Sequence, residues 1–266
     1  MLTLKGRTMV ITGGAGNNGM EIVNMALREG MNVCLLSGLH GKAQKAIESI
    51  DPQYKDHVMG LAQNPKAQWE HNMSLAPEIY ENNPRMADMI RLVYERFGSV
   101  DVVVNAKGGH VRYSFDEMDR EKWRHSMELP ESAFVNAKNA LPYLLKSKAP
   151  RIINIMSLDA RNGGWLPDPS FAASRAALEA LTYDLAKELG PRGITSNCIV
   201  IGHIEGDVPA EDTLTEELRA ELRAKTPVPR LGVPKDLPAA VAFLASEEAD
   251  FVNGARIDIN GGMIVG

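Results

Sequence analysis

The 266-residue chain has only two cysteines, Cys34 and Cys198, and both lie in apolar runs that are typical of strands. So few cysteines exclude a disulfide-stapled scaffold, and their apolar surroundings favour buried thiols kept in a reducing compartment. We therefore expect a cytoplasmic protein.

The chain also lacks any excess of positive charge, since Asp and Glu outnumber Lys and Arg and the formal net charge is -5. Without a basic footprint, nucleic acid is not an expected partner. No apolar stretch is long enough to span a bilayer. Thr3, Lys5 and Arg7 interrupt the N-terminal segment where a signal peptide would need an apolar run. The expected partner is a small-molecule substrate, with neither membrane nor nucleic acid involved.

Short β-branched apolar runs alternate with amphipathic segments along the whole chain. Near-continuous apolar runs indicate strands covered on both faces, and they occupy residues 8–12, 32–37, 57–62, 100–106, 151–156, 195–201 and 256–259. Helical patterns fill residues 20–29, 85–97, 131–146 and 174–189. Gly30, Gly98 and Gly190 each follow a helical run, where a left-handed cap residue is favoured. The alternation predicts an α/β Rossmann-type doubly wound fold, with a mainly parallel seven-stranded sheet and helices on both faces.

Two segments exceed a minimal unit of this fold. Residues 64–84 are polar and interrupted by prolines, which predicts an insertion after the third strand. Residues 203–229 are acidic and partly helical, over 213–224, and follow the sixth strand, where a substrate lid is expected. Neither segment has the composition of a linker, so we expect residues 1–266 to form a single dinucleotide-binding domain.

A glycine-rich loop directly follows the first expected strand and precedes a helix. Its sequence over residues 12–19 is T-G-G-A-G-N-N-G, in which Gly14, Gly16 and Gly19 satisfy G-x-G-x-x-G. In this strand–turn–helix context the backbone amides can face a pyrophosphate. The residues expected to hold a dinucleotide here are Gly13, Gly14, Gly16, Asn17, Asn18 and Gly19.

From about residue 4 to its C-terminus the chain resembles the short-chain dehydrogenase/reductase family. The loop follows the family pattern T-G-x-x-x-G-x-G, with Asn17 in place of the middle Gly and Asn18 in place of an apolar residue. Asn tolerates a left-handed backbone, so the turn can survive the first exchange. Residues 105–108 stand for N-N-A-G, and family motifs at residues 193–197, 243–246, 253–254 and 260–262 follow in order.

The resemblance implies an NAD(P)-binding oxidoreductase acting on a small alcohol or carbonyl. It adds Ser37, Asn64, Asn105, Ala106, Arg175, Gly202 and Ile204 to the expected cofactor contacts. Ser37 stands where an Asp or Glu would exclude a 2′-phosphate, which favours NADP(H) over NAD(H). No metal site is expected. Helices 131–146 and 171–189 correspond to those that pair subunits in relatives, which implies a homodimer or homotetramer.

The chain departs from the family pattern at the residues of the proton relay. Ser157 stands at the family's Ser position, but Phe171 and Arg175 replace the Tyr and Lys of Y-x-A-S-K, and Pro130 replaces the Asn. Phe has no proton to give, and the guanidinium of Arg is too basic to serve as an acid. The usual Tyr-dependent relay is therefore excluded.

Other groups in the expected carboxyl-end loops could supply the missing acid. His203 and His110 are the leading candidates because an imidazole titrates near neutrality, and Tyr113 and Asp159 lie in similar loops. The expected catalytic set is thus Ser157, Phe171, Arg175, His203 and His110.

Three functions remain open from the sequence. The first is an atypical oxidoreductase without the Tyr–Lys relay. The second is a non-redox lyase, isomerase or dehalogenase-like enzyme on the same scaffold, since halohydrin dehalogenases also use Arg for Lys, although they keep the Tyr. The third is a catalytically inactive cofactor-binding homologue.

Overall fold

A computed structural model describes residues 2–64, 84–108, 112–165, 168–206 and 215–265. Within these ranges seven parallel strands form one sheet in the order β3-β2-β1-β4-β5-β6-β7. The strands are β1 (Thr8–Thr12), β2 (Asn32–Leu39), β3 (Val58–Asn64), β4 (Val102–Asn105), β5 (Arg151–Ser157), β6 (Thr195–Ile201) and β7 (Arg256–Ile259). The strand order reverses direction between β1 and β4, the position at which such sheets bind ligands.

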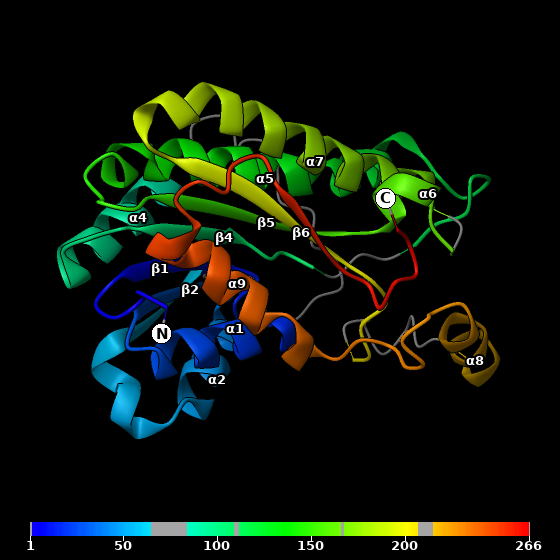
Figure 1. Cartoon of the computed structure of the whole chain (residues 1–266), viewed down its shortest axis with the longest axis horizontal. Helices are drawn as coiled ribbons and strands as arrows, with labels where there is room; N and C mark the ends of the chain where they lie inside the picture. The colour runs from blue at the N-terminus through cyan, green and yellow to red at the C-terminus, as the bar shows by residue number, and fades with distance from the viewer. Residues whose placement is uncertain (1, 65–83, 109–111, 166–167, 207–214, 266) are drawn as a thin grey trace.

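Helices cover both faces of the sheet (Figure 1). One face carries α1 (Asn17–Arg28), α2 (His40–Ser49) and α9 (Pro238–Ala245). The other carries α4 (Pro84–Phe97), α5 (Arg120–Leu144) and α7 (Pro169–Leu189). The predicted doubly wound α/β fold with a parallel seven-stranded sheet is confirmed.

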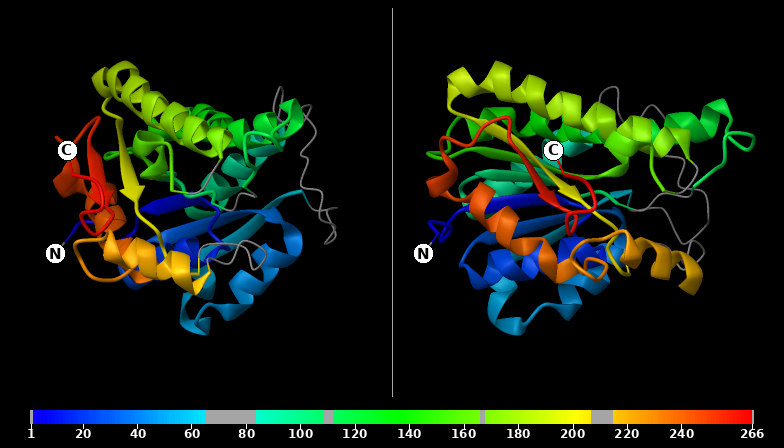
Figure 2. Two further views of the ribbon diagram at one scale, coloured as in Figure 1. Left: turned by 90° about the vertical axis from the view of Figure 1, so that its right-hand side faces the viewer. Right: turned by 45° about the vertical axis from the view of Figure 1, so that its right-hand side comes forward.

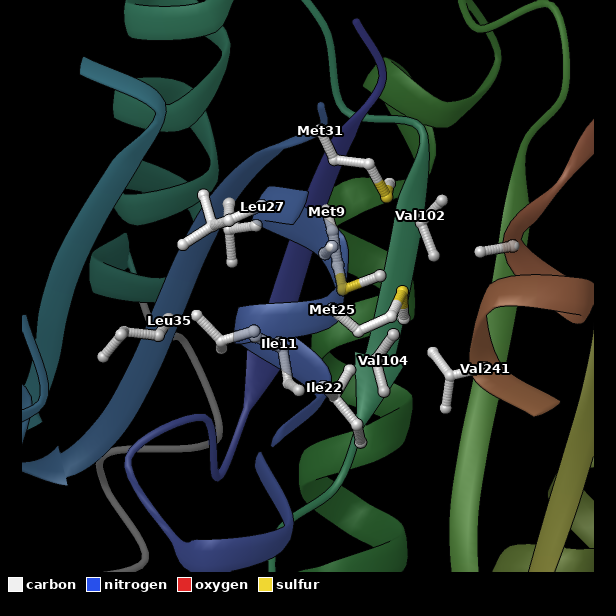
Figure 3. Packing of buried hydrophobic residues seen from close by; sticks show 14 of the residues in the cluster. Met9, Ile11, Ile22, Met25, Leu27, Met31, Leu35, Val102, Val104 and Val241 are labelled. Atoms are coloured by element: carbon white, nitrogen blue, oxygen red, sulfur yellow. The ribbon is translucent and has the colours of Figure 1, made fainter. Parts of the chain in front are cut away.

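The central strand β1 is buried on both sides because its side chains alternate between two cores. Met9 and Ile11 pack with α1, β4 and α9 (Figure 3). Val10, which points the opposite way, belongs to the cluster formed with α4 and α5. Both thiols, Cys34 and Cys198, are free and buried as expected, and burial raises the pKa of Cys198 to about 12.

Two helices begin earlier than the hydrophobic pattern indicates. Helix α5 starts at Arg120, with the Asp119 carboxylate accepting a hydrogen bond from the Lys122 amide, and it continues through Pro130. The proline removes one backbone hydrogen bond, but the packing of α5 between α4 and α7 keeps the helix continuous. Helix α7 starts at Pro169, whose fixed φ suits the first helical position behind the cap residue Asp168.

The left-handed cap residue expected at Gly190 lies at Gly193 instead. Gly190 has a right-handed backbone, with φ of -53°, because the chain adds a 3-10 turn over Gly190–Arg192. The left-handed residue is Gly193, with φ of 81°. Gly30 and Gly98 have positive φ as expected.

Two further short helices lie at the carboxyl edge of the sheet. Helix α6 (Asp159–Asn162) directly follows β5, and α8 (Glu216–Ala224) lies in the segment expected to form a lid. Helix α8 projects beyond the sheet edge (Figure 2). Most of the expected insertion, residues 65–83, falls outside the described ranges, as do residues 207–214 of the lid segment. None of the described helices is both long and apolar enough to cross a membrane.

Candidate active site

The glycine loop between β1 and α1 leaves no space for side chains at its ends. A Cβ on Gly13 would lie 2.4 Å from the backbone oxygen of Ala106, and φ at this residue is +70°. A Cβ on Gly19 would lie 2.2 Å from the oxygen of Gly13, and one on Gly14 would meet the Leu35 side chain at 2.7 Å. Gly16 is the N-cap residue of α1. The loop is therefore close-packed against β2 and β4, with the N-terminus of α1 at its end.

The two asparagines of the loop take different directions. Asn17 is the first residue of α1 and needs no left-handed backbone, because all positive-φ residues in the described ranges are glycines. Its Nδ2 donates to the backbone oxygen of Gly206. Asn18 is buried, and its Oδ1 has no hydrogen-bond partner in the structure. The side chain of Asn17 thus ties the loop to the segment after β6.

Asn105 belongs to a buried chain of side-chain amides. Its Oδ1 accepts a 2.8 Å bond from Asn136, and its Nδ2 donates over 2.7 Å to Asn154. Asn154 in turn donates over 2.8 Å to Thr182 on α7. These bonds join β4 and β5 to both covering helices, so the Asn105 side chain is engaged within the protein. The neighbouring Ala106 amide donates to the Thr12 oxygen, which fixes the end of β4 against β1.

The other expected cofactor residues lie along the same edge. Ser37 is buried near the end of β2, and Asn64 ends β3. Gly202 follows β6, where a Cβ would lie 2.9 Å from Asn260 Cα. Ile204 is buried and pairs with Gly232 in an isolated bridge. This bridge holds the backbone after β6 against the segment around Gly232.

Ser157 and Asp159 lie at the end of β5, next to the end of β6. Ser157 is the partner of Ile201 in the sheet register, and the Leu158 amide donates to the Ile201 oxygen over 2.9 Å. The Asp159 amide donates to Ser157 Oγ over 3.3 Å. The Asp159 carboxylate is 1% exposed, and its Oδ1 has no partner. A serine hydroxyl and a buried carboxylate are thereby brought together.

Phe171 contacts two guanidinium groups. The Arg175 guanidinium carbon lies 4.1 Å from the ring centroid, and that of Arg112 lies 4.2 Å from it. Arg175 is buried and donates from Nη1 to Ser174 Oγ over 3.1 Å. Arg112 Nη2 forms an ion pair with Asp159 Oδ2 at 3.3 Å. The aromatic face attracts both cations, so the ring gathers positive charge near Asp159.

His203 follows β6 and faces the same cluster. Its Nε2 is buried without a partner. Burial is the main cause that lowers the pKa of His203 below its usual value. The Asp159 carboxylate raises this pKa, and the nearby Arg112 charge lowers it. The lowered pKa favours the neutral imidazole, which can accept a proton.

Lys107, which departs from the family pattern, contacts α5, the helix that contains Pro130. Lys107 Nζ lies 3.4 Å from Glu128 Oε2 on α5, and the Glu128 side chain is 12% exposed. His125 Nδ1 lies 3.2 Å from the other oxygen of that carboxylate. Lys107 is thus engaged with α5.

The structure brings Ser157, Phe171, Arg175 and His203 to one end of the sheet, and His110 lies outside the described residues. Arg112 was missed from the sequence because a single Arg in a long loop carries no positional signal. Asp168 was also missed, although Asp before Pro is an N-cap signature. Its carboxylate accepts bonds from the amides of Ser170, Phe171 and Tyr113.

Comparisons with known proteins agree with the fold and the motifs. A family model described as enoyl-(acyl carrier protein) reductase matches residues 19–264. The chain belongs to the short-chain dehydrogenase/reductase family of oxidoreductases. The resemblance inferred from the motifs is thereby confirmed.

Individual relatives cover almost the whole chain. It is 29% identical to the 3-oxoacyl-(acyl-carrier-protein) reductase FabG of Vibrio cholerae, over 98% of this chain and 99% of the relative. It is also 29% identical to that of Staphylococcus aureus, over 97% and 98%. A short-chain dehydrogenase/reductase structure from Brucella melitensis, titled glucose/ribitol dehydrogenase, superposes with a TM-score of 0.85 at 26% identity, covering 100% of this chain and 99% of that one.

Proposed function

We propose that this protein is an NAD(P)-dependent oxidoreductase that acts on a small alcohol or carbonyl compound and moves the proton through His203. The observation that carries the proposal is the arrangement of Ser157, Asp159 and His203 at adjacent strand ends, beside a close-packed glycine loop. Phe171 and Arg175 take the family's Tyr and Lys positions and have no part in the proton step.

The loop fits a dinucleotide. Gly13 and Gly19 let the loop pack closely where any Cβ would clash with backbone, and the buried Oδ1 of Asn18 lacks a partner within the protein. The α1 N-terminus suits a pyrophosphate. The residues that would hold the cofactor are Gly13, Gly14, Gly16, Asn17, Asn18, Gly19, Ser37, Asn64, Asn105, Ala106, Arg175, Gly202 and Ile204. Among them, Ser37 favours NADP(H). When bound, the nicotinamide supplies or accepts the hydride.

The chain's own residues perform the proton step. Ser157 Oγ donates a hydrogen bond to the substrate oxygen and holds it beside the imidazole. In alcohol oxidation the neutral His203 takes the hydroxyl proton at Nε2, and the buried Asp159 carboxylate stabilises the resulting cation. In carbonyl reduction the same proton returns to the oxygen.

A simple assay tests the proposal. Binding of NADP(H) and NAD(H) is measured by calorimetry, and absorbance of the reduced nicotinamide is followed with short oxo and hydroxy compounds. We expect cofactor binding and cofactor consumption that matches product formation. Product formed without a change in cofactor absorbance would instead identify a non-redox enzyme, and cofactor binding without any turnover an inactive homologue.

We further propose that the protein is a homodimer or homotetramer that pairs through α5 and α7. These helices lie together on one face of the sheet (Figure 1). Trp123, Phe134 and Tyr183 are exposed on them, and exposed aromatic side chains are enriched in interfaces. Light scattering after size exclusion, with Phe134→Lys as the variant, tests this assembly. Residence in the cytoplasm stays a prediction.

A further inference from the structure

We propose that Arg112, held on the ring of Phe171, forms a carboxylate-binding subsite, so that the substrate is a small hydroxy or oxo acid. This inference rests on the proposed function, because it places the reacting oxygen at Ser157 and His203. It adds the chemical class of the molecule that carries that oxygen.

Arg112 supplies an unused hydrogen-bond donor inside the site. Its Nη2 is engaged with Asp159 at 3.3 Å, whereas its Nη1 is buried and has no partner. The side chain is only 17% exposed, so water does not freely satisfy the group. An unpaired buried donor on a cation is costly, and an anionic oxygen on a ligand would remove that cost.

The charged groups around the Phe171 ring leave Arg112 with the unused donor. The described residues place two permanent cations there, Arg112 and Arg175, together with two buried carboxylates, Asp159 and Asp168. Asp168 is engaged with backbone amides at the start of α7. A ligand carboxylate would therefore pair with Arg112 Nη1, which has no partner.

Two further unpartnered atoms match a hydroxyl group. Asp159 Oδ1 is a buried acceptor, and His203 Nε2 is a buried ring nitrogen, and both lack partners. Both residues belong to the Arg112 cluster, since Arg112 pairs with Asp159 and both side chains act on the pKa of His203. A hydroxyl donates one hydrogen bond and accepts others. A molecule with a carboxylate at Arg112 and a hydroxyl near His203 therefore satisfies the Arg112 donor and one of these two acceptors.

Matched neutral and anionic probes test the subsite. Calorimetry compares acetate, lactate and acetoacetate with acetamide, lactamide and acetoacetamide at equal ionic strength, with and without NADP(H). We expect at least one carboxylate to bind about tenfold or more tightly than its amide, because a guanidinium pairs with a carboxylate through charge-assisted bonds. Equal affinity within every pair, or no carboxylate binding, would overturn the proposal.

Variants then locate the binding. Arg112→Gln should abolish the preference for the carboxylate, whereas Arg161→Gln, which removes an exposed cation from α6, should preserve it. Arg112→Gln leaves Asp159 buried without its counter-ion, so Arg112→Gln with Asp159→Asn serves as a second variant that buries no unpaired charge. Circular dichroism verifies folding. A carboxylate preference that survives in the double variant would place the anion elsewhere and overturn the proposal.

Turnover separates this proposal from the proposed function. Carboxylate binding that depends on Arg112, without cofactor turnover of any probe, would support the subsite and contradict the redox function. Faster turnover of the neutral probes than of the carboxylates would support the redox function and contradict the subsite.

Discussion

The Arg175 guanidinium carbon lies 4.1 Å from the centroid of the Phe171 ring, one turn earlier on α7. The four-residue spacing places both side chains on one face of the helix. At these two positions the family pattern has a phenol and an ammonium group. Here the ring instead contacts the guanidiniums of Arg175 and Arg112. The residues therefore organise positive charge and leave proton transfer to another group.

A tyrosine at position 171 should report the positive charge around this ring through the pKa of its phenol. In Phe171→Tyr, the two guanidiniums near the ring should lower the pKa of the new phenol below its usual value of about 10. The ring is half-buried, so the opposing effect of burial is the smaller one. Tyrosinate absorbance, titrated against the parent protein, measures the shift. The matched variant Phe251→Tyr, at a ring that is 99% exposed, should titrate near the usual value, and equal pKa values in the two variants would contradict the account.

The glycine loop predicts a steep difference between two neighbouring substitutions. Gly19→Ala would place Cβ 2.2 Å from the Gly13 oxygen, whereas Gly16→Ala would place it at 3.4 Å. Backbone must move in the first case, at a cost of about 1–3 kcal/mol of the free energy of unfolding. Chemical denaturation and NADP(H) calorimetry should show loss of stability and affinity for Gly19→Ala. A loss of stability as large for Gly16→Ala would show that steric clash at Gly19 is not the cause.

The buried amide chain should contribute to stability. Asn154→Ala removes the bonds to Asn105 and Thr182 and leaves a buried amide without its partner. We expect a loss of about 1–3 kcal/mol of unfolding free energy, measured in urea. Asn139→Ala is the control, because its side chain bonds only to a carbonyl of its own helix and Ala is a strong helix former. It should change stability little.

The fold could be predicted from the sequence because buried parallel strands are apolar runs, and all seven were located to within a few residues. Helix boundaries were less accurate. The helical pattern began at residue 131, directly after Pro130, yet α5 runs through that proline, because packing between α4 and α7 outweighs one lost hydrogen bond. Gly190 met the pattern of a left-handed cap, but the extra 3-10 turn moves that cap to Gly193.

The candidate site was only partly predictable. Ser157, Phe171 and Arg175 follow from motif positions, and the structure places them at one end of the sheet. His203, chosen as an imidazole in the loop after the sixth strand, lies at the same end. The contribution of Arg112 was not predictable, because its contacts with Phe171 and Asp159 join residues far apart in the sequence. The hydrogen bond from Asn17 to Gly206 could not be predicted from the sequence either, since only the fold brings the loop and the segment after β6 together.

The pH dependence of alcohol oxidation, followed through the reduced nicotinamide, tests the central claim most directly. Because burial lowers the pKa of His203, its neutral form persists into acid, and the rate should fall only as pH drops through a value below 6.5. His203→Gln should lose about 100-fold or more in kcat, together with this acid limb. His57→Gln, at an exposed histidine that contacts Asn32, should keep the parent profile. An unchanged rate and profile in His203→Gln would contradict the account.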